Sequence, residues 1–179
     1  FNTAISTPTE ASAAAQFAVE KQGWSKAYVL EDATLKYTQS WVENFKKHYE
    51  FFGGTVAGAA TFQNNDPTIG TQIAQMRNLE FDVIGMCSFP PGGPSAIRQI
   101  RASGILAPIV LCAGMEGLDW LESVPQLENA FVMTRANFMG KDPDPKINEF
   151  YDRFSKTTGW ELARSHAAEG YCAIQLYAE

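Results

Sequence analysis

The sequence predicts an α/β fold in which a parallel sheet lies between layers of helices. Short apolar stretches with strand character alternate with amphipathic stretches of helical period from residue 7 to residue 124. Only short turns separate them, which is typical of a parallel sheet with right-handed crossover connections. We therefore expect a three-layer α/β lobe with the sheet in the middle.

The predicted crossover helices are bounded by residues that favour helix ends. In the first helix, Thr7 is the expected cap, Pro8 suits the first turn, Glu10 completes a capping box and Gly23 ends the helix.

Asp66 is interpreted in the same way, as the cap of a later helix rather than a ligand contact. The later helices are expected at residues 37–54, from residue 66 to 76, and at 94–104.

Four strands are predicted between these helices. Each is short and almost continuously apolar, as expected of a strand that is buried on both faces of a parallel sheet. They are expected at residues 26–32, 55–62, 81–88 and 107–114, and a short helix is expected at 117–124.

The pattern changes after Pro125. Residues 130–138 have strand character, and two amphipathic helices are expected at 145–159 and 163–179 with no strand between them. We therefore predict two parts, residues 1–130 and residues 131–179, with the boundary near residues 125–136.

Composition argues against several classes of partner. The net charge of −6 and the lack of a Lys/Arg cluster disfavour nucleic acid. No apolar run is long enough to cross a bilayer. The three cysteines are too few and too scattered for a disulfide framework or a metal site. Because the chain starts at FNTAIS without a methionine or a leader, we interpret it as a piece of a longer protein.

The loops after the strands are the expected binding region, because ligands of open α/β sheets bind beyond the carboxyl ends of the strands. These loops contain a phenol, Tyr37, and a carboxylate, Glu116, which suits a ligand ammonium. Two alternatives stay open: Glu116 as a first-turn acid of the short helix after it, and the Phe89–Pro94 run as a rigid turn that enters a helix. The apolar side chains expected to complete a small-molecule pocket are Phe89, Pro90, Pro91, Met115 and Trp120.

The same loops lack the signatures of common catalytic sites. The dinucleotide, P-loop and hydrolase-elbow motifs are all absent from the sequence. His48 and His166 fall inside predicted helices, so we interpret them as solvent-facing or locally hydrogen-bonded. We therefore do not expect an enzyme, a cofactor or a metal site.

Five segments follow one another along the chain: LEDATLKYTQSWVENFKK, TFQNNDPTIGTQIAQMRNLEFDVI, IRQIRASGI, AGMEG and YCAIQLYAE. Their order and spacing resemble the type I periplasmic binding proteins of ABC transporters. The most similar branch is the leucine/isoleucine/valine-binding family. The resemblance rests on the ordered set and covers essentially all 179 residues.

This resemblance implies a protein of two α/β lobes that are joined by crossing strands and clamp a ligand between them. Residues 1–130 would form the second lobe, with FNTAIS and AFVMTRANF as the hinge-crossing segments. Residues 137–179 would return to the first lobe, the other half of which is absent from this chain.

The resemblance also assigns roles to individual residues. Glu116 matches the acid that accepts the α-ammonium group of an amino-acid ligand, and Tyr37 matches a tyrosine that lines the cleft. The family often has another tyrosine after the third strand. Here Ser88 and Phe89 occupy that region, so a phenol is lost and apolar bulk is gained. The predicted ligand contacts are Glu116, Tyr37, Phe89, Ser88 and Met115.

The implied function is that of an extracytoplasmic solute-binding component, secreted or lipid-anchored, which delivers its ligand to a membrane permease. The implied ligand is a branched-chain amino acid or a related small amphipathic solute. One alternative is the effector- or signal-binding lobe of a transcriptional regulator or receptor with the same fold. A further alternative is an enzyme of flavodoxin-like topology, which the missing catalytic motifs disfavour.

Overall fold

The computed structural model describes residues 4–160 and 164–178. They divide into two compact units. The large unit contains Ser6–Met115 and Asp119–Met133, and the small unit contains Phe1–Ile5, Glu116–Leu118 and Thr134–Glu179. The predicted hinge-crossing role of FNTAIS falls partly on residues 1–3, which lie outside the described residues.

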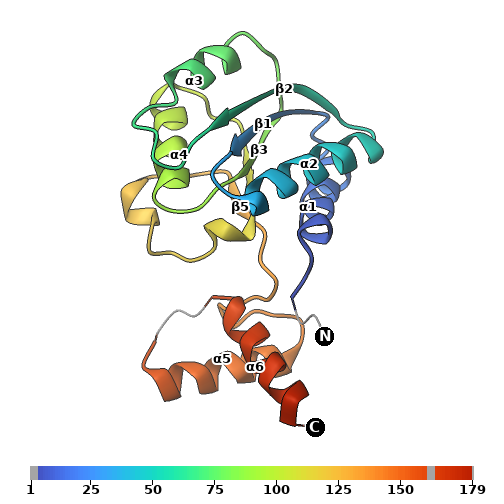
Figure 1. Cartoon of the computed structure of the whole chain (residues 1–179), viewed down its shortest axis with the longest axis vertical. Helices are drawn as coiled ribbons and strands as arrows, with labels where there is room; N and C mark the ends of the chain where they lie inside the picture. The colour runs from blue at the N-terminus through green and yellow to red at the C-terminus, as the bar shows by residue number, and fades with distance from the viewer. Residues whose placement is uncertain (1–3, 161–163, 179) are drawn as a thin grey trace. The chain divides into compact units, whose positions relative to one another are not determined.

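The large unit is built on a five-stranded sheet in which every neighbouring pair of strands is parallel (Figure 1). The strand order is β2-β1-β3-β4-β5. The predicted parallel α/β fold is therefore confirmed. The strands are β1 (Lys26–Asp32), β2 (Thr55–Phe62), β3 (Val83–Cys87), β4 (Ile109–Leu111) and β5 (Ala130–Val132).

Four helices cover the two faces of this sheet (Figure 1). Alternate residues of β1 enter two separate cores, as the two-residue period of a strand requires. Tyr28 and Leu30 pack with α3 and α4, whereas Ala27 and Val29 pack with α1 and α2. The helices are α1 (Thr7–Gln16, continued by a π-helical turn at Phe17–Lys21), α2 (Lys36–Phe51), α3 (Gly70–Met76) and α4 (Gly92–Ala102).

Two predicted helix starts are wrong. The cap of α1 is Ser6, whose hydroxyl accepts a hydrogen bond from the Thr9 amide at 3.4 Å, so Thr7 already lies inside the helix. The third helix begins at Gly70 instead of Asp66. The Asp66 carboxylate accepts from the Gln63 amide at 2.8 Å, so it closes a turn before the helix.

The fourth strand and the segment after it are shorter than predicted. The strand ends at Leu111, because Ala113–Met115 already form a 3₁₀ turn. The short helix expected at residues 117–124 is a single 3₁₀ turn at Leu121–Ser123. The rest of this stretch is loop, which leaves room for side chains at the carboxyl edge of the sheet.

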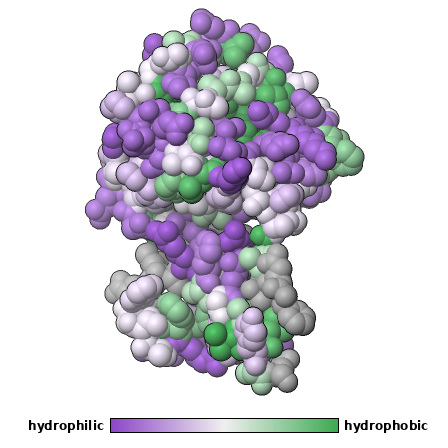
Figure 2. Space-filling view, viewed as in Figure 1, coloured by the Kyte–Doolittle hydropathy of each residue, from purple (hydrophilic) through white to green (hydrophobic). Residues whose placement is uncertain are grey.

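The small unit contains two helices, α5 (Pro145–Thr158) and α6 (His166–Ala178). Asp144 caps α5 by accepting from the Lys146 amide at 2.9 Å. Tyr151 is buried in the core of this unit. Hydrophobic patches lie at its surface in Figure 2. Exposed large apolar side chains of α6 are Tyr171, Ile174, Leu176 and Tyr177.

Replacing Gly85 with alanine is expected to lower the free energy of unfolding by about 1–3 kcal/mol, the range for overpacking a core. Gly85 lies in the middle of β3, and a Cβ there would come within 2.5 Å of the Phe45 ring. Denaturant-induced unfolding checks this. Gly70→Ala is the control, because its Cβ would meet only the Thr68 hydroxyl at 3.4 Å. Equal losses for the two variants would contradict the steric explanation.

Candidate ligand-binding site

The loops after β1, β2 and β3 are joined by hydrogen bonds to one buried carboxylate, Asp32. Its Oδ2 accepts from the Ser88 hydroxyl at 2.7 Å and from the Asn64 side-chain amide at 2.7 Å. Its Oδ1 accepts from the Thr34 amide at 3.1 Å. Ser88, one of the predicted ligand contacts, is therefore fully buried and donates its proton within the protein.

Tyr37 lies at the start of α2 and points to a second buried carboxylate. Its hydroxyl donates to Glu10, with distances of 3.0 Å to Oε1 and 3.3 Å to Oε2. Glu10 also accepts from the Ala113 amide at 2.8 Å, which connects α1 to the loop after β4. Burial, together with the neighbouring Cys112 thiol, raises the pKa of Tyr37 well above its ordinary value, so the phenol stays protonated.

Close approach at two glycines brings Tyr37, Ser88 and Met115 together. A Cβ at Gly114 would lie 2.6 Å from the Ser88 carbonyl oxygen and 3.5 Å from the Tyr37 ring. A Cβ at Gly93 would collide with the sulfur of Met115, which is fully buried. These three predicted residues therefore cluster at the carboxyl edge of the sheet.

Phe89 follows Ser88 at the same edge, and its side chain is partly exposed. Its carbonyl oxygen accepts from the Asn64 side-chain amide at 2.8 Å and from the Gly93 amide at 3.0 Å. The loop after β3 is thereby fixed to the loop after β2 and to the first turn of α4.

Glu116 belongs to the small unit, where the residue is only 2% exposed. It accepts from the Ser165 amide at 2.7 Å and from the Ser165 hydroxyl at 2.6 Å. It also lies 3.1 Å from His166 Nδ1. Ser165 directly precedes α6, so the carboxylate satisfies the amino terminus of that helix. The sequence had suggested the short helix immediately after Glu116 for such a role.

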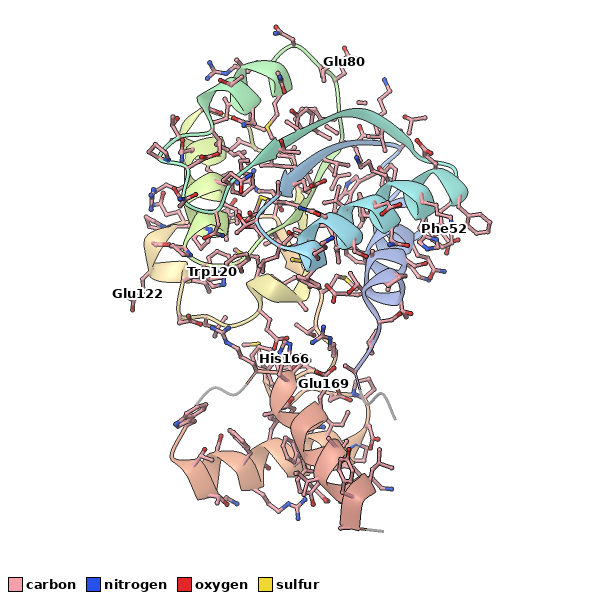
Figure 3. The ribbon with its side chains drawn as sticks, in the orientation of Figure 1. Phe52, Glu80, Trp120, Glu122, His166 and Glu169 are labelled. Atoms are coloured by element: carbon pink, nitrogen blue, oxygen red, sulfur yellow. The ribbon has the colours of Figure 1, made fainter. Side chains whose placement is uncertain are left out.

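His166, which is labelled with Glu169 in Figure 3, is the first residue of α6. Its two ring nitrogens lie within hydrogen-bond distance of Glu116 and Arg135. Arg135 Nη1 is 2.6 Å from His166 Nε2 and 3.3 Å from the Glu169 carboxylate. A guanidinium has only donors, so Nε2 accepts and Nδ1 carries the proton that is donated to Glu116. His166 is therefore locally hydrogen-bonded, in agreement with its interpretation from the sequence.

Tyr151 supports the same segment from α5. Its hydroxyl lies 3.3 Å from the carbonyl oxygens of Arg164 and Ser165, to which it donates. Burial, followed by the negative charge of Glu116, raises the pKa of Tyr151 to about 12. The phenol is consequently a proton donor throughout the neutral range.

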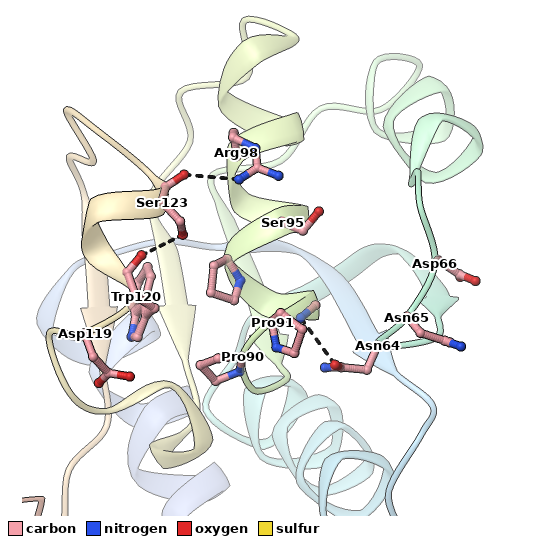
Figure 4. A pocket seen from close by; sticks show the side chains of 12 residues that line it. Asn64, Asn65, Asp66, Pro90, Pro91, Ser95, Arg98, Asp119, Trp120 and Ser123 are labelled. Atoms are coloured by element: carbon pink, nitrogen blue, oxygen red, sulfur yellow. Dashed lines mark hydrogen bonds between the residues drawn. The ribbon is translucent and has the colours of Figure 1, made fainter.

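A pocket of about 510 Å³ opens on the large unit beside these loops (Figure 4). It is formed by the loop after β2, the start of α4 and the segment around the last 3₁₀ turn. Its lining residues are Asn64, Asn65, Asp66, Pro90, Pro91, Gly92, Pro94, Ser95, Arg98, Asp119, Trp120 and Ser123.

This pocket overlaps only partly with the residues expected from the sequence. Pro90, Pro91 and Trp120 of the predicted apolar wall line it, whereas the five predicted ligand contacts do not. Sequence reasoning missed Arg98 and Ser95. Their spacing places them on one face of the helix that follows the third strand, which is the signal that would have indicated them.

Within residues 4–160 and 164–178, no helix has the length and apolar character needed to span a membrane. The same residues contain no group of three or more His, Cys, Asp or Glu side chains placed to hold a metal ion.

A parallel sheet with buried polar loops and a pocket at its carboxyl edge is the architecture of an α/β ligand-binding lobe. The chain belongs to the periplasmic binding protein family, the model of which matches residues 1–179. The family resemblance inferred from the ordered segments is thus confirmed. No match was found among curated proteins.

Three solved structures illustrate the similarity of the fold. The leucine-binding protein LivK of Thermotoga maritima has a TM-score of 0.82 and 21% identity, covering 94% of this chain and 48% of that chain. The branched-chain amino acid substrate-binding protein LivJ of Streptococcus pneumoniae, solved with isoleucine, has a TM-score of 0.84 and 19% identity. The match covers 96% of this chain and 49% of that chain.

A solute-binding protein of an ABC transporter from Rhodopseudomonas palustris, solved with benzoate, has a TM-score of 0.80 and 18% identity. The match covers 98% of this chain and 48% of that chain. The present chain therefore spans about half the length of each of these structures.

Proposed function

We propose that the chain is the second lobe, with part of the return to the first lobe, of a solute-binding protein of an ABC transporter. The observation that carries the proposal is the family match over residues 1–179 in a chain that spans about half of its structural relatives. Residues 1–130 supply the lobe, and residues 131–179 supply the hinge crossing and the returning helices. The protein acts outside the cytoplasm and delivers its ligand to a membrane permease.

The proposed ligand is a branched-chain amino acid or a related small amphipathic solute. In the proposed contact set, Phe89 and Tyr37 are partly exposed and Met115 and Ser88 are buried, and Glu116 is the proposed acceptor of the ligand ammonium. An ionised carboxylate offers about four acceptor positions, and three are used by Ser165 and His166. The ligand ammonium would take the fourth position, which requires that Glu116, 2% exposed in this chain, open to the ligand.

Ligand capture in this proposal needs no covalent chemistry. A ligand that makes contacts on both lobes binds the closed form more tightly than the open form, so it shifts the population toward closure. The difference in affinity between the two forms is the free energy that drives the change.

The test is a thermal-shift screen of the two-lobed protein against amino acids and simple carboxylic acids. A ligand at 100 times its Kd is expected to stabilise the folded state by about 2.7 kcal/mol. If no member of the panel shifts the unfolding temperature, the proposed solute class is wrong.

Glu116→Gln is expected to weaken the binding of an amino-acid ligand by about tenfold or more, because a charge-assisted hydrogen bond to the ammonium is lost. Affinity for a carboxylic acid of the same shape that lacks the amine should change little. Calorimetry on the two-lobed protein measures both. Glu122→Gln, an exposed acid, is the matched control. Unchanged amino-acid affinity in Glu116→Gln would remove Glu116 from the site.

A further inference from the structure

We propose that the pocket in the large unit binds a small organic monocarboxylate and that Arg98 is its anion-binding group. The volume of about 510 Å³ lies within the range of small-molecule sites. The residues that line it are separate from the five contacts predicted from the sequence.

Arg98 projects from α4 and is held at the pocket by one hydrogen bond (Figure 4). Its Nη1 donates to the Ser123 carbonyl oxygen at 3.2 Å. A guanidinium carries five N–H donors in a fixed plane, so this bond orients the group while other donors remain for a ligand. Ser95 lies one turn earlier on the same helix face and adds a hydroxyl to the lining.

The first turn of α4 reinforces the preference for an anion. This helix of 11 residues has no acidic residue in its first turn, and Gly92 at its start lines the pocket. The Gly92 amide is bonded to Asn64 Oδ1 at 3.3 Å, and the Gly93 amide to the Phe89 carbonyl. Because both amides are already bonded within the protein, Arg98 supplies the direct contact, and the helix adds only the partial positive charge of its amino terminus.

The walls suit the apolar body of such a ligand. Pro90, Pro91 and Pro94 present rings from the loop after β3 and the start of α4. Trp120 forms the facing wall, and its indole N–H donates to the Met115 carbonyl oxygen at 2.9 Å, which fixes the ring. These apolar side chains suit the hydrocarbon part of a ligand, and Arg98 suits its carboxylate.

Two acids also line the pocket, and they restrict the ligand. The Asp66 carboxylate is turned back to the Gln63 amide at 2.8 Å. Asp119 lies at the opposite end from Arg98 (Figure 4). Arg98 is the one cationic side chain among the lining residues, so the pocket suits a ligand with one negative charge rather than two.

Every residue that lines this pocket belongs to the large unit of this chain, so the pocket can be tested without the other lobe. It differs in this respect from the proposed amino-acid site, which needs the other lobe. The 179-residue chain alone is therefore sufficient for the test, and its outcome is independent of the proposed transport function.

The probe is 4-methylpentanoate, compared with the neutral 4-methylpentanamide of nearly the same shape. Calorimetry at low salt should give saturable binding of the acid to the 179-residue chain and at least tenfold weaker binding of the amide. The acid should also shift the NMR signal of the Trp120 indole N–H, assigned with Trp120→Phe. Equal affinities, or no saturable binding of the acid, would overturn the proposal.

Arg98→Gln should weaken the binding of the acid by about tenfold or more. The circular dichroism spectrum should stay unchanged, because Arg98 is exposed. Arg98→Lys keeps the charge and should retain part of the affinity. Arg77→Gln is the matched control, since Arg77 also donates to a carbonyl oxygen, that of Ser103 at 2.7 Å, but lies outside the pocket. An Arg98→Gln protein that binds as tightly as Arg77→Gln would exclude Arg98 as the anion-binding group.

Discussion

Asp32→Ala is expected to lower the free energy of unfolding by about 3 kcal/mol, because it leaves several hydrogen-bond donors without their acceptor. The carboxylate is fully buried and accepts from the Ser88 hydroxyl, the Asn64 side-chain amide and the Thr34 amide. Ser88 is also fully buried, so water cannot replace the lost acceptor without opening the loops. The loops after three strands would loosen together.

Denaturant-induced unfolding followed by tryptophan fluorescence measures this effect. Asp66→Ala is the matched control, since that partly exposed carboxylate accepts one backbone amide and its loss should cost under about 1 kcal/mol. In the double variant Asp32→Ala with Ser88→Ala, the loss of unfolding free energy should be smaller than the sum of the losses in the two single variants, because both substitutions disrupt one network. Simple additivity, or a loss no larger than that of Asp66→Ala, would show that the Asp32 network contributes little.

The second large effect is expected at Glu116, where alanine and glutamine should differ. Glu116→Ala removes a buried acceptor from the Ser165 amide and hydroxyl and from His166, and should destabilise the start of α6 by about 2–3 kcal/mol. Glu116→Gln should destabilise the start of α6 by less than half as much. Its amide oxygen keeps the bonds from the Ser165 amide and His166, and the Ser165 hydroxyl can rotate to accept from the new N–H.

Hydrogen exchange of the α6 amides gives the local free energy of opening for each variant. Glu122→Ala, at an exposed acid on the last 3₁₀ turn, should leave the exchange of α6 unchanged. If alanine and glutamine at position 116 accelerate exchange equally, the carboxylate does not hold the start of α6 through hydrogen bonds.

The fold could be predicted from the sequence because its signals are local and repeated. The apolar run of β1 indicated a strand buried on both faces, and Tyr28 and Val29 indeed enter opposite cores. Helix starts were less predictable. Ser6 and Thr7 both have hydroxyls suited to capping, and Asp66 has a closer partner in the Gln63 amide than any helix amide.

The candidate site was predictable only as a region. The rule that ligands bind at the carboxyl edge of a parallel sheet selected the loops that contain Tyr37, Ser88 and Met115. It gave no information on their partners, because Ser88 bonds to a residue 56 positions away and Glu116 to one 49 positions away. Arg98 was not predicted as a site residue, because a lone arginine on a helix is usually solvated.

The strand order β2-β1-β3-β4-β5 also has a consequence for synthesis on the ribosome. After β1 and β2 pair, β3 joins the free side of β1, β4 joins β3, and β5 joins β4. Each newly made strand therefore adds to an open edge, and none has to insert between strands that are already paired. The bond from the Ala113 amide to Glu10 can form only when the nascent chain has passed β4, so α1 is fastened to that loop late in translation.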